Sequence, residues 1–290
     1  MLRVGLITDE LSMDFDYVIK VMKENNYKEA EIRGIWGKNI ADMSIDEVKK
    51  AREMMDKNGI RACAVCSPFY KCTQPGMKAE GAAGPAHGAK EKTFEDQIDL
   101  LYDLIAKSRI LGTNIIRSFA FWKKGPFTDE VFNLIVESYR KPLEIAKKEN
   151  IILALENEPA CYGGRGKDIS RILKALNHPN LKTVWDPGNA YVAGEDPFPG
   201  GYEAVKDYIV HVHIKDPIQS ERDVTSGERK FKFNEVGKGI MDFKAQFRAL
   251  SKHYDGVLSL ETHYVLEGDT TGKGTIECMK SLTRIVSEIK

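Results

Sequence analysis

The stretch Ile151-Ile152-Leu153-Ala154-Leu155-Glu156-Asn157-Glu158-Pro159 is an apolar run, typical of a buried strand, that ends abruptly in acid. Carboxylates are rarely buried unless they are paired or bind a metal, so an acid at the end of a core strand requires a partner. Three later apolar runs lead just as directly into a side chain that can bind a metal, at Asp186, His213 and Glu261. Four successive strands are therefore expected to end in a residue that can bind a metal.

The hydrophobic pattern around these runs alternates between short apolar strands and amphipathic helices, which is typical of βα units and a parallel sheet. Eight such pairs predict a closed (β/α)8 TIM barrel that forms a single domain over residues 1–290. A capping box at Ser44 and Glu47 marks one helix start. We expect strands near 3–8, 28–33, 60–66, 114–119, 151–157, 181–186, 209–214 and 256–261, and helices near 14–25, 44–58, 94–111, 128–149, 168–177, 202–207, 242–253 and 274–289.

An open doubly wound sheet is the rival architecture, and it would normally carry a glycine-rich phosphate loop after its first strand. The sequence there is Thr8-Asp9-Glu10-Leu11, which has no glycine. Gly163-Gly164-Arg165-Gly166 follows the fifth strand but lacks the spacing of a phosphate-binding loop, so we interpret it as a flexible active-site loop. The barrel is the better interpretation.

Composition narrows the class of protein. The 290 residues are 42% hydrophobic and carry 43 basic and 43 acidic side chains, so there is no net charge to attract a nucleic acid. No segment approaches about 20 uninterrupted apolar residues, and the first residues enter a strand pattern without a signal peptide, which predicts a cytoplasmic protein with no membrane partner. Three of the five cysteines, Cys63, Cys66 and Cys72, are interpreted as reduced thiols without a catalytic role. Homo-oligomerisation is left open.

Two connections are unusually long. Residues 67–93 are rich in proline and glycine, and residues 217–241 are mostly polar and contain Gly237-Lys238-Gly239. Both follow strands, so both are expected on the face where barrel enzymes carry out their chemistry.

In a parallel barrel the carboxyl ends of neighbouring strands converge, so Glu156, Asp186, His213 and Glu261 are expected to point at a common centre. Three carboxylates and one imidazole suit one divalent ion, namely Mn²⁺, Mg²⁺ or Co²⁺, with Zn²⁺ also acceptable. The alternative is that each acid caps a helix or pairs with a basic side chain. His211, two residues before His213, is expected to be a core or supporting histidine.

Several motifs together resemble the xylose isomerase-like TIM barrels of the sugar phosphate isomerase/epimerase superfamily. They are Leu155-Glu156-Asn157, Trp185-Asp186-Pro187-Gly188-Asn189, residues 211–216 (HVHIKD), Val236-Gly237-Lys238-Gly239 with Asp242-Phe243, and Ser259-Leu260-Glu261. The resemblance covers almost the whole chain. It implies that Glu156, Asp186, His213 and Glu261 hold a divalent metal that chelates adjacent oxygens of a hydroxy-ketone. It also implies that Glu156 and Glu261 exchange a proton on opposite faces of the reacting carbon.

One position departs from that family. Asn189 stands three residues after Asp186, where many members have a histidine, and an amide cannot titrate near neutral pH. The difference argues against assigning the activity of the rare-ketose epimerases directly to this chain. It also argues against the apurinic endonuclease branch, which needs that histidine and others.

Asn189, which can donate a hydrogen bond, is a candidate substrate contact, and so are further side chains near the strand ends. Glu158 and His263 lie on the same strand faces as Glu156 and Glu261 but nearer the rim, where each could be a base, a substrate contact or simply solvent-exposed. Lys215 could neutralise an oxyanion or form a salt bridge with Asp216 or Glu158. The remaining candidates, which could instead simply cap the core, are Arg33 and Trp36 after the second strand and Arg117, Phe119 and Trp122 after the fourth.

These observations predict a metal-dependent isomerase or epimerase of a small polyhydroxylated carbonyl compound, which moves a proton through a metal-stabilised enediolate. An alternative is a dehydratase of the inosose or dehydroshikimate type on the same scaffold. The same residues would also be compatible with a metal-dependent enzyme that cleaves carbon–glycoside bonds, or with a ligand-binding barrel that has no catalytic activity.

Overall fold

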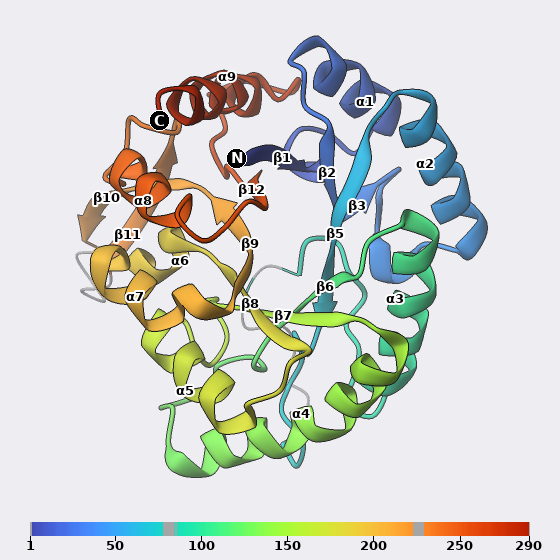
Figure 1. The fold of residues 1–290 in the computed structure, drawn as a ribbon, viewed down its shortest axis with the longest axis vertical. Coiled ribbons are helices and arrows are strands. Elements are labelled where there is room, and N and C mark those ends of the chain that lie inside the picture. Colours follow the sequence, from blue (N-terminus) through green and yellow to red (C-terminus); the bar gives the residue numbers. More distant parts are fainter. Residues whose placement is uncertain (1, 78–83, 85, 223–228, 290) are drawn as a thin grey trace.

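The computed structural model describes residues 2–77, 84, 86–222 and 229–289. Eight parallel strands close into a barrel in the order β1-β12-β9-β8-β7-β6-β5-β2, and the helices form a ring outside it (Figure 1). The predicted (β/α)8 fold is therefore confirmed. The barrel strands are β1 (Arg3–Ile7), β2 (Glu29–Ile32), β5 (Arg61–Phe69), β6 (Ile115–Ser118), β7 (Ile152–Glu156), β8 (Leu181–Trp185), β9 (Ile209–Ile214) and β12 (Val257–Leu260).

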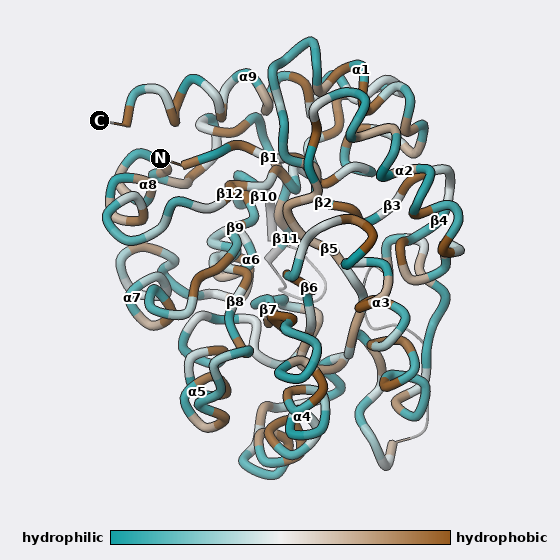
Figure 2. Tube along the Cα trace, turned by 45° about the vertical axis from the view of Figure 1, so that its right-hand side comes forward, coloured by the Kyte–Doolittle hydropathy of each residue, from teal (hydrophilic) through white to brown (hydrophobic). Residues whose placement is uncertain are grey.

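The outer helices begin and end at residues whose chemistry favours those positions. Ser44 and Glu47 form the capping box of α2, and Thr128 accepts a hydrogen bond from the backbone of Val131 at the start of α4. Apolar and polar segments alternate along α4 and α5, as expected for helices that pack one face on the barrel (Figure 2). The helices are α1 (Phe15–Glu24), α2 (Ile45–Lys57), α3 (Gln97–Leu111), α4 (Asp129–Glu149), α5 (Gly166–Leu176), α6 (Pro187–Val192), α7 (Tyr202–Val205), α8 (Phe243–Leu250) and α9 (Lys273–Ser287), with short helical turns η1 (Thr8–Glu10), η2 (Ile40–Asp42), η3 (Pro197–Gly201) and η4 (Lys206–Tyr208).

The barrel interior is polar along its axis, and β2 shows why. Successive side chains of a strand point to opposite faces, so Ala30 and Ile32 pack into the hydrophobic core while Glu29, Glu31 and Arg33 face inward. Glu29 pairs with arginines at the amino end of the barrel, Glu31 contacts histidines in the middle, and Arg33 reaches Glu261 at the carboxyl end. One strand thus supplies charged groups at three levels of the barrel.

The long connections contain structure that the sequence did not predict. Within 217–241, expected to be a loop, β10 (Asp216–Arg222) and β11 (Arg229–Asn234) pair as an antiparallel hairpin. The hairpin forms because Phe231 and Phe233 alternate with lysines and pack against Tyr191 and His263, at ring-centroid distances of 5.7 and 5.2 Å.

The segment after β2 also forms a small hairpin, from β3 (Gly34–Ile35) and β4 (Lys38–Asn39). In the expected loop 67–93, β5 continues through Phe69, while residues 78–83 and 85 lie outside the described part of the chain. Among the helices that the structure describes, we find none with the length and apolar character needed to cross a membrane.

Candidate metal centre

The four predicted ligands come together at the carboxyl end of the barrel. Glu156 ends β7, Asp186 follows β8, His213 lies near the end of β9 and Glu261 follows β12. One potential ligand atom from each residue lies within 4.8 Å of the others, and all four residues are buried. Neighbouring parallel strands place these side chains in one group, as the sequence pattern led us to expect.

Asp186 is held by the turn that it starts. It is the N-cap of α6, where its Oδ1 accepts a hydrogen bond of 2.7 Å from the backbone N–H of Asn189. The Asn157 side chain donates to the carbonyl of Asp186 at 2.8 Å and accepts from its N–H at 2.9 Å. A Cβ at Gly188 would lie 2.5 Å from Cγ of Lys215, so this turn requires glycine where it passes the lysine. The Asn157 and Asp186-Pro187-Gly188-Asn189 motifs therefore fix the direction of one carboxylate.

Glu156 is ionised although it is buried. Arg117 Nη1 donates to its Oε2 at 3.0 Å, and Asn189 Nδ2 donates to its Oε1 at 3.2 Å. Burial alone would raise the pKa of Glu156, but the charges of Arg117 and His213 outweigh it and leave the pKa below its ordinary value. Asn189, which cannot act as a base, thus orients the Glu156 carboxylate.

Glu261 lies between two cations. Arg33 Nη1 is 2.6 Å from its Oε1, and Lys215 Nζ is 2.7 Å from its Oε2. Burial raises the pKa of this carboxyl, but Lys215 and His213 lower it more, so the pKa lies well below its ordinary value. Arg33 also pairs with Asp9 and Glu10, which links η1 to the centre.

The sequence left open the alternative that each acid caps a helix or pairs with a basic side chain. Asp186 does cap a helix, and Glu156 and Glu261 do pair with basic side chains, yet negative charge remains. Three permanent cations, Arg33, Arg117 and Lys215, pair with five largely buried carboxylates among the described residues, namely Asp9, Glu10, Glu156, Asp186 and Glu261.

Asp186 shows where the charge is least compensated. Its Oδ2 is buried without a hydrogen bond, although Lys215 Nζ lies 3.0 Å away, and burial raises its pKa to about 7. A divalent cation would offset this excess charge, and three carboxylates with one imidazole fit a hard or borderline ion.

The predicted substrate contacts lie at different distances from this centre. Lys215 points into it and pairs with Asp186 and Glu261 rather than with Asp216 or Glu158. His263 lies at the rim, with its Nε2 3.5 Å from Lys215 Nζ, and burial lowers its pKa. Arg33 reaches the centre through its ion pair with Glu261.

Glu158 and the aromatic candidates lie around a second lysine. Glu158 pairs with Lys71 at 3.0 Å, and Lys71 Nζ lies 4.6 Å from the ring centroid of Phe119 and 5.3 Å from that of Trp122. Trp36 packs on Phe15 of α1 and under Lys50 of α2, so the structure does not bring it to the group of ligands. Its substrate-binding role stays a prediction without support from these contacts.

Asp216 has a structural role. Its side chain accepts hydrogen bonds from the backbone N–H groups of Gly237, Gly239 and Met241 at 2.8, 2.8 and 3.1 Å. The Val236-Gly237-Lys238-Gly239 motif therefore anchors the hairpin loop beside Lys215.

Glu31 and Lys71 contact candidate site residues but were not predicted from the sequence. Glu31 is buried inside the barrel against His211 and His213, and Lys71 forms the pair with Glu158. The signal for Glu31 was present, because an acid at the centre of a strand that alternates Glu29-Ala30-Glu31-Ile32 must face either the core or the barrel axis. Lys71 lies in a segment without periodicity and gave no such signal.

Comparison with known proteins agrees with this geometry. Residues 19–282 match the family described as xylose isomerase-like TIM barrel. The chain belongs to this family. Among curated relatives, an inosose dehydratase from Serratia proteamaculans is 23% identical over 263 residues, which cover 82% of this chain and 83% of that protein.

Two solved structures share the fold. One is the probable 3-DHS dehydratase of petrobactin synthesis from Bacillus anthracis, with a TM-score of 0.74 and 19% identity over 97% of this chain and 99% of that one. The other is the IOLI protein with a bound zinc atom, with a TM-score of 0.74 and 18% identity over 100% and 99% of the two chains. The chain is therefore an enzyme of this family, and the curated relative named above is a dehydratase of inosose, a small sugar-like molecule.

Proposed function

We propose that this protein is a divalent-metal-dependent lyase that removes water from a small polyhydroxylated ketone. The observation that carries the proposal is the convergence of Glu156, Asp186, His213 and Glu261, with one buried oxygen of Asp186 that accepts no hydrogen bond. These four residues would hold the ion. The dehydratase names of the relatives favour water loss over the isomerisation that the sequence pattern favoured.

A bound divalent cation would polarise the substrate carbonyl and acidify the neighbouring C–H bond. The chain itself must then accept that proton, stabilise the enediolate and help the β-hydroxyl to leave. Glu156 and Glu261 are ionised, so either can accept a proton. Arg117 and Arg33 restrict the two carboxylates to fixed directions.

Lys215 supplies positive charge next to the oxyanion. Its ammonium lies between Asp186 and Glu261, and although burial lowers its pKa, these acids raise it more, so the group stays charged. His263 is 30% exposed and lies beside Lys215, which makes it the candidate to relay a proton from water to the leaving hydroxyl. The rim position lets its ring exchange protons with water.

The second candidate is an isomerase or epimerase, which uses the same enediolate but returns the proton to carbon. Glu156 and Glu261 favour it, because with two ionised carboxylates one can take the proton from carbon and the other can return it.

One experiment separates the two candidates. Metal-loaded protein would be incubated in D₂O with inosose and with 3-dehydroshikimate, and the products analysed by mass spectrometry. Loss of water supports the lyase. Deuterium incorporation without loss of water supports the isomerase, and the absence of both with a panel of ketoses contradicts the enzyme proposal.

A further inference from the structure

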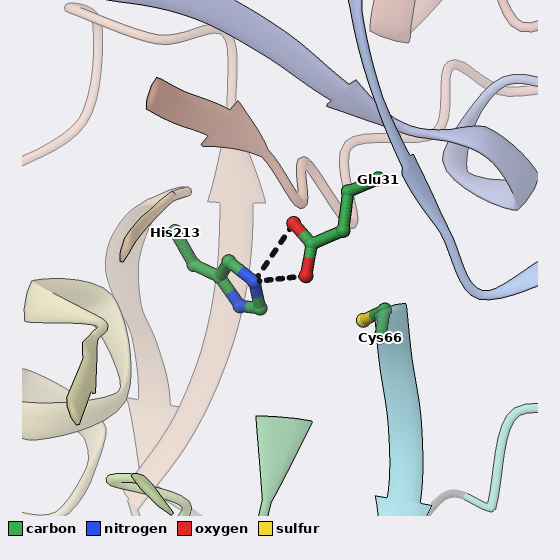
Figure 3. A group of neighbouring side chains, drawn as sticks. All are labelled: Glu31, Cys66 and His213. Carbon is green, nitrogen blue, oxygen red and sulfur yellow. Dashed lines mark hydrogen bonds and ion pairs between the residues drawn. The ribbon is translucent and has the colours of Figure 1, made fainter. Parts of the chain in front are cut away.

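The imidazole of His213 is held from two sides. Its Nδ1 faces the other ligand residues, at 3.2 Å from Glu156 Oε1 and 3.4 Å from Glu261 Oε2. Its Nε2 faces the opposite way, toward both carboxylate oxygens of Glu31 at 3.0 and 3.1 Å (Figure 3). The two nitrogens therefore have different tasks.

We propose that Glu31 is a positioning residue that keeps the proton of His213 on Nε2 and so presents Nδ1 to the metal. The role rests on the proposed metal centre and adds a residue to it. An ionised carboxylate can only accept hydrogen bonds, so both ring nitrogens donate while no metal is bound, Nε2 to Glu31 and Nδ1 to Glu156 at 3.2 Å. A metal held by Glu156 and Glu261 would displace the proton on Nδ1, whereas Glu31, which is not one of the four candidate ligands, would keep the proton on Nε2.

The position of Glu31 makes this contact specific. The residue is 0% exposed, in the centre of β2 and below the level of the four ligands. His211 Nε2 approaches Glu31 Oε2 at 2.8 Å from the amino-terminal side, which fixes the carboxylate from the direction opposite to His213. A buried carboxylate between two imidazoles cannot rotate away without losing both partners.

Cys66 provides the rival explanation and the matched control. Its sulfur lies with Glu31 and His213 in a group that could itself hold a metal, yet Figure 3 shows ion-pair lines only between Glu31 and His213. Burial raises the pKa of the Cys66 thiol well above its ordinary value, which disfavours a thiolate ligand. The geometry therefore favours a hydrogen bond at Nε2 over a second metal.

The test compares full-length wild type with Glu31→Gln, Glu31→Asp and Cys66→Ser. Each protein is stripped of metal, checked by circular dichroism, and titrated with Zn²⁺ and Co²⁺ against a chromophoric chelator. Loss of such a partner typically weakens metal binding by about 10- to 100-fold, so Glu31→Gln should raise the Kd by that factor. Glu31→Gln removes the negative charge of the acceptor and Glu31→Asp keeps it, so Glu31→Asp should recover part of the affinity, and Cys66→Ser should keep the wild-type Kd.

Imidazole ¹⁵N NMR of the Zn²⁺-loaded wild type provides a readout that needs no variant to fold. We expect a metal-bound Nδ1 and a protonated Nε2 on His213, and the opposite assignment would overturn the role of Glu31. An unchanged Kd in Glu31→Gln would do so as well. Binding of two ions per chain, reduced to one by Cys66→Ser, would make Glu31 a ligand instead. Wild type that binds no divalent cation would overturn the metal centre itself and this role with it.

Discussion

We expect the addition of metal to reverse which protein is the more stable, wild type or the variant Asp186→Asn. Without metal, the variant should unfold at a higher temperature than wild type at pH 8, because a poorly compensated buried charge is removed. With saturating Mn²⁺ or Zn²⁺, wild type should gain stability and the variant should not. The substitution keeps the helix cap, since the side-chain oxygen of asparagine can still accept from Asn189.

The magnitude follows from the pKa of Asp186, which burial raises to about 7 from an ordinary value of 3.8. Such a difference costs the folded state ~4 kcal/mol when the carboxyl is ionised. We expect about half of this to be recovered, because the new amide would face Lys215, 3.0 Å from the present oxygen. For 290 residues the entropy of unfolding is about 0.6 kcal/mol/K, so ~2 kcal/mol raises the Tm by about 3 °C.

The metal effect is of similar size. A ligand at 100 times its Kd stabilises the folded state by about 2.7 kcal/mol, which corresponds to a Tm increase of about 4 °C for wild type. The pH dependence provides an internal check. The folded-state pKa is raised, so the cost of Asp186 is absent below about pH 4, where both states are protonated, and is complete above pH 7.

Scanning calorimetry of both proteins in EDTA and in excess metal, at pH 5 and pH 8, measures all of these effects. The advantage of Asp186→Asn in EDTA should be clear at pH 8 and smaller at pH 5. A variant that is less stable than wild type in EDTA at pH 8 would refute the claim that the negative charge of Asp186 is poorly compensated in the folded protein. Equal metal-induced shifts in both proteins would refute its role as a ligand.

Three further predictions concern the same centre. Replacing both Glu156 and Glu261 by glutamine should lower turnover by at least about 100-fold, measured with whichever ketone the D₂O assay identifies; full turnover would remove both from the mechanism. Metal affinity should fall as the pH is lowered from 8 to 6. Burial lowers the pKa of His213, but the carboxylates around it raise the pKa more, so the pKa lies well above its ordinary value and a metal must displace a proton. Chelator competition at each pH would measure this effect. Arg33→Met removes a cation that three buried carboxylates share, and it should lower the free energy of unfolding by about 3–5 kcal/mol in urea titrations. The exposed Arg140→Met should change it by less than about 0.5 kcal/mol, and equal losses would contradict the argument.

Local pattern in the sequence was sufficient to predict the barrel and the meeting of the four candidate ligands. The strands were predictable because apolar runs bounded by turn residues mark buried parallel strands, and observed ends differ from expected ones by only a few residues at β5 and less elsewhere. The convergence of Glu156, Asp186, His213 and Glu261 followed from the geometry of any parallel barrel. Their roles as ligands remain a proposal.

Pairings across the barrel were not predictable. Lys215 pairs with Asp186 and Glu261 rather than with its neighbour Asp216. The Asp216 carboxylate instead accepts hydrogen bonds from backbone N–H groups 21 to 25 residues further along the chain. The six residues of α6 are too few for a helical period, and the turn was visible only as a motif. Contacts of this kind depend on which side chains meet after the barrel has closed.

The alternation of β2 has a consequence for how this barrel can change over time. Glu29, Glu31 and Arg33 each have charged or imidazole partners on other strands, so replacing one residue leaves another buried group without its complement. Substitutions along the axis should therefore be strongly non-additive, and double-mutant cycles between β2 and β9 or β12 should give large coupling energies. Evolution of a new specificity would then proceed more easily through the rim loops, while residues of the axis could be exchanged only in compensating pairs.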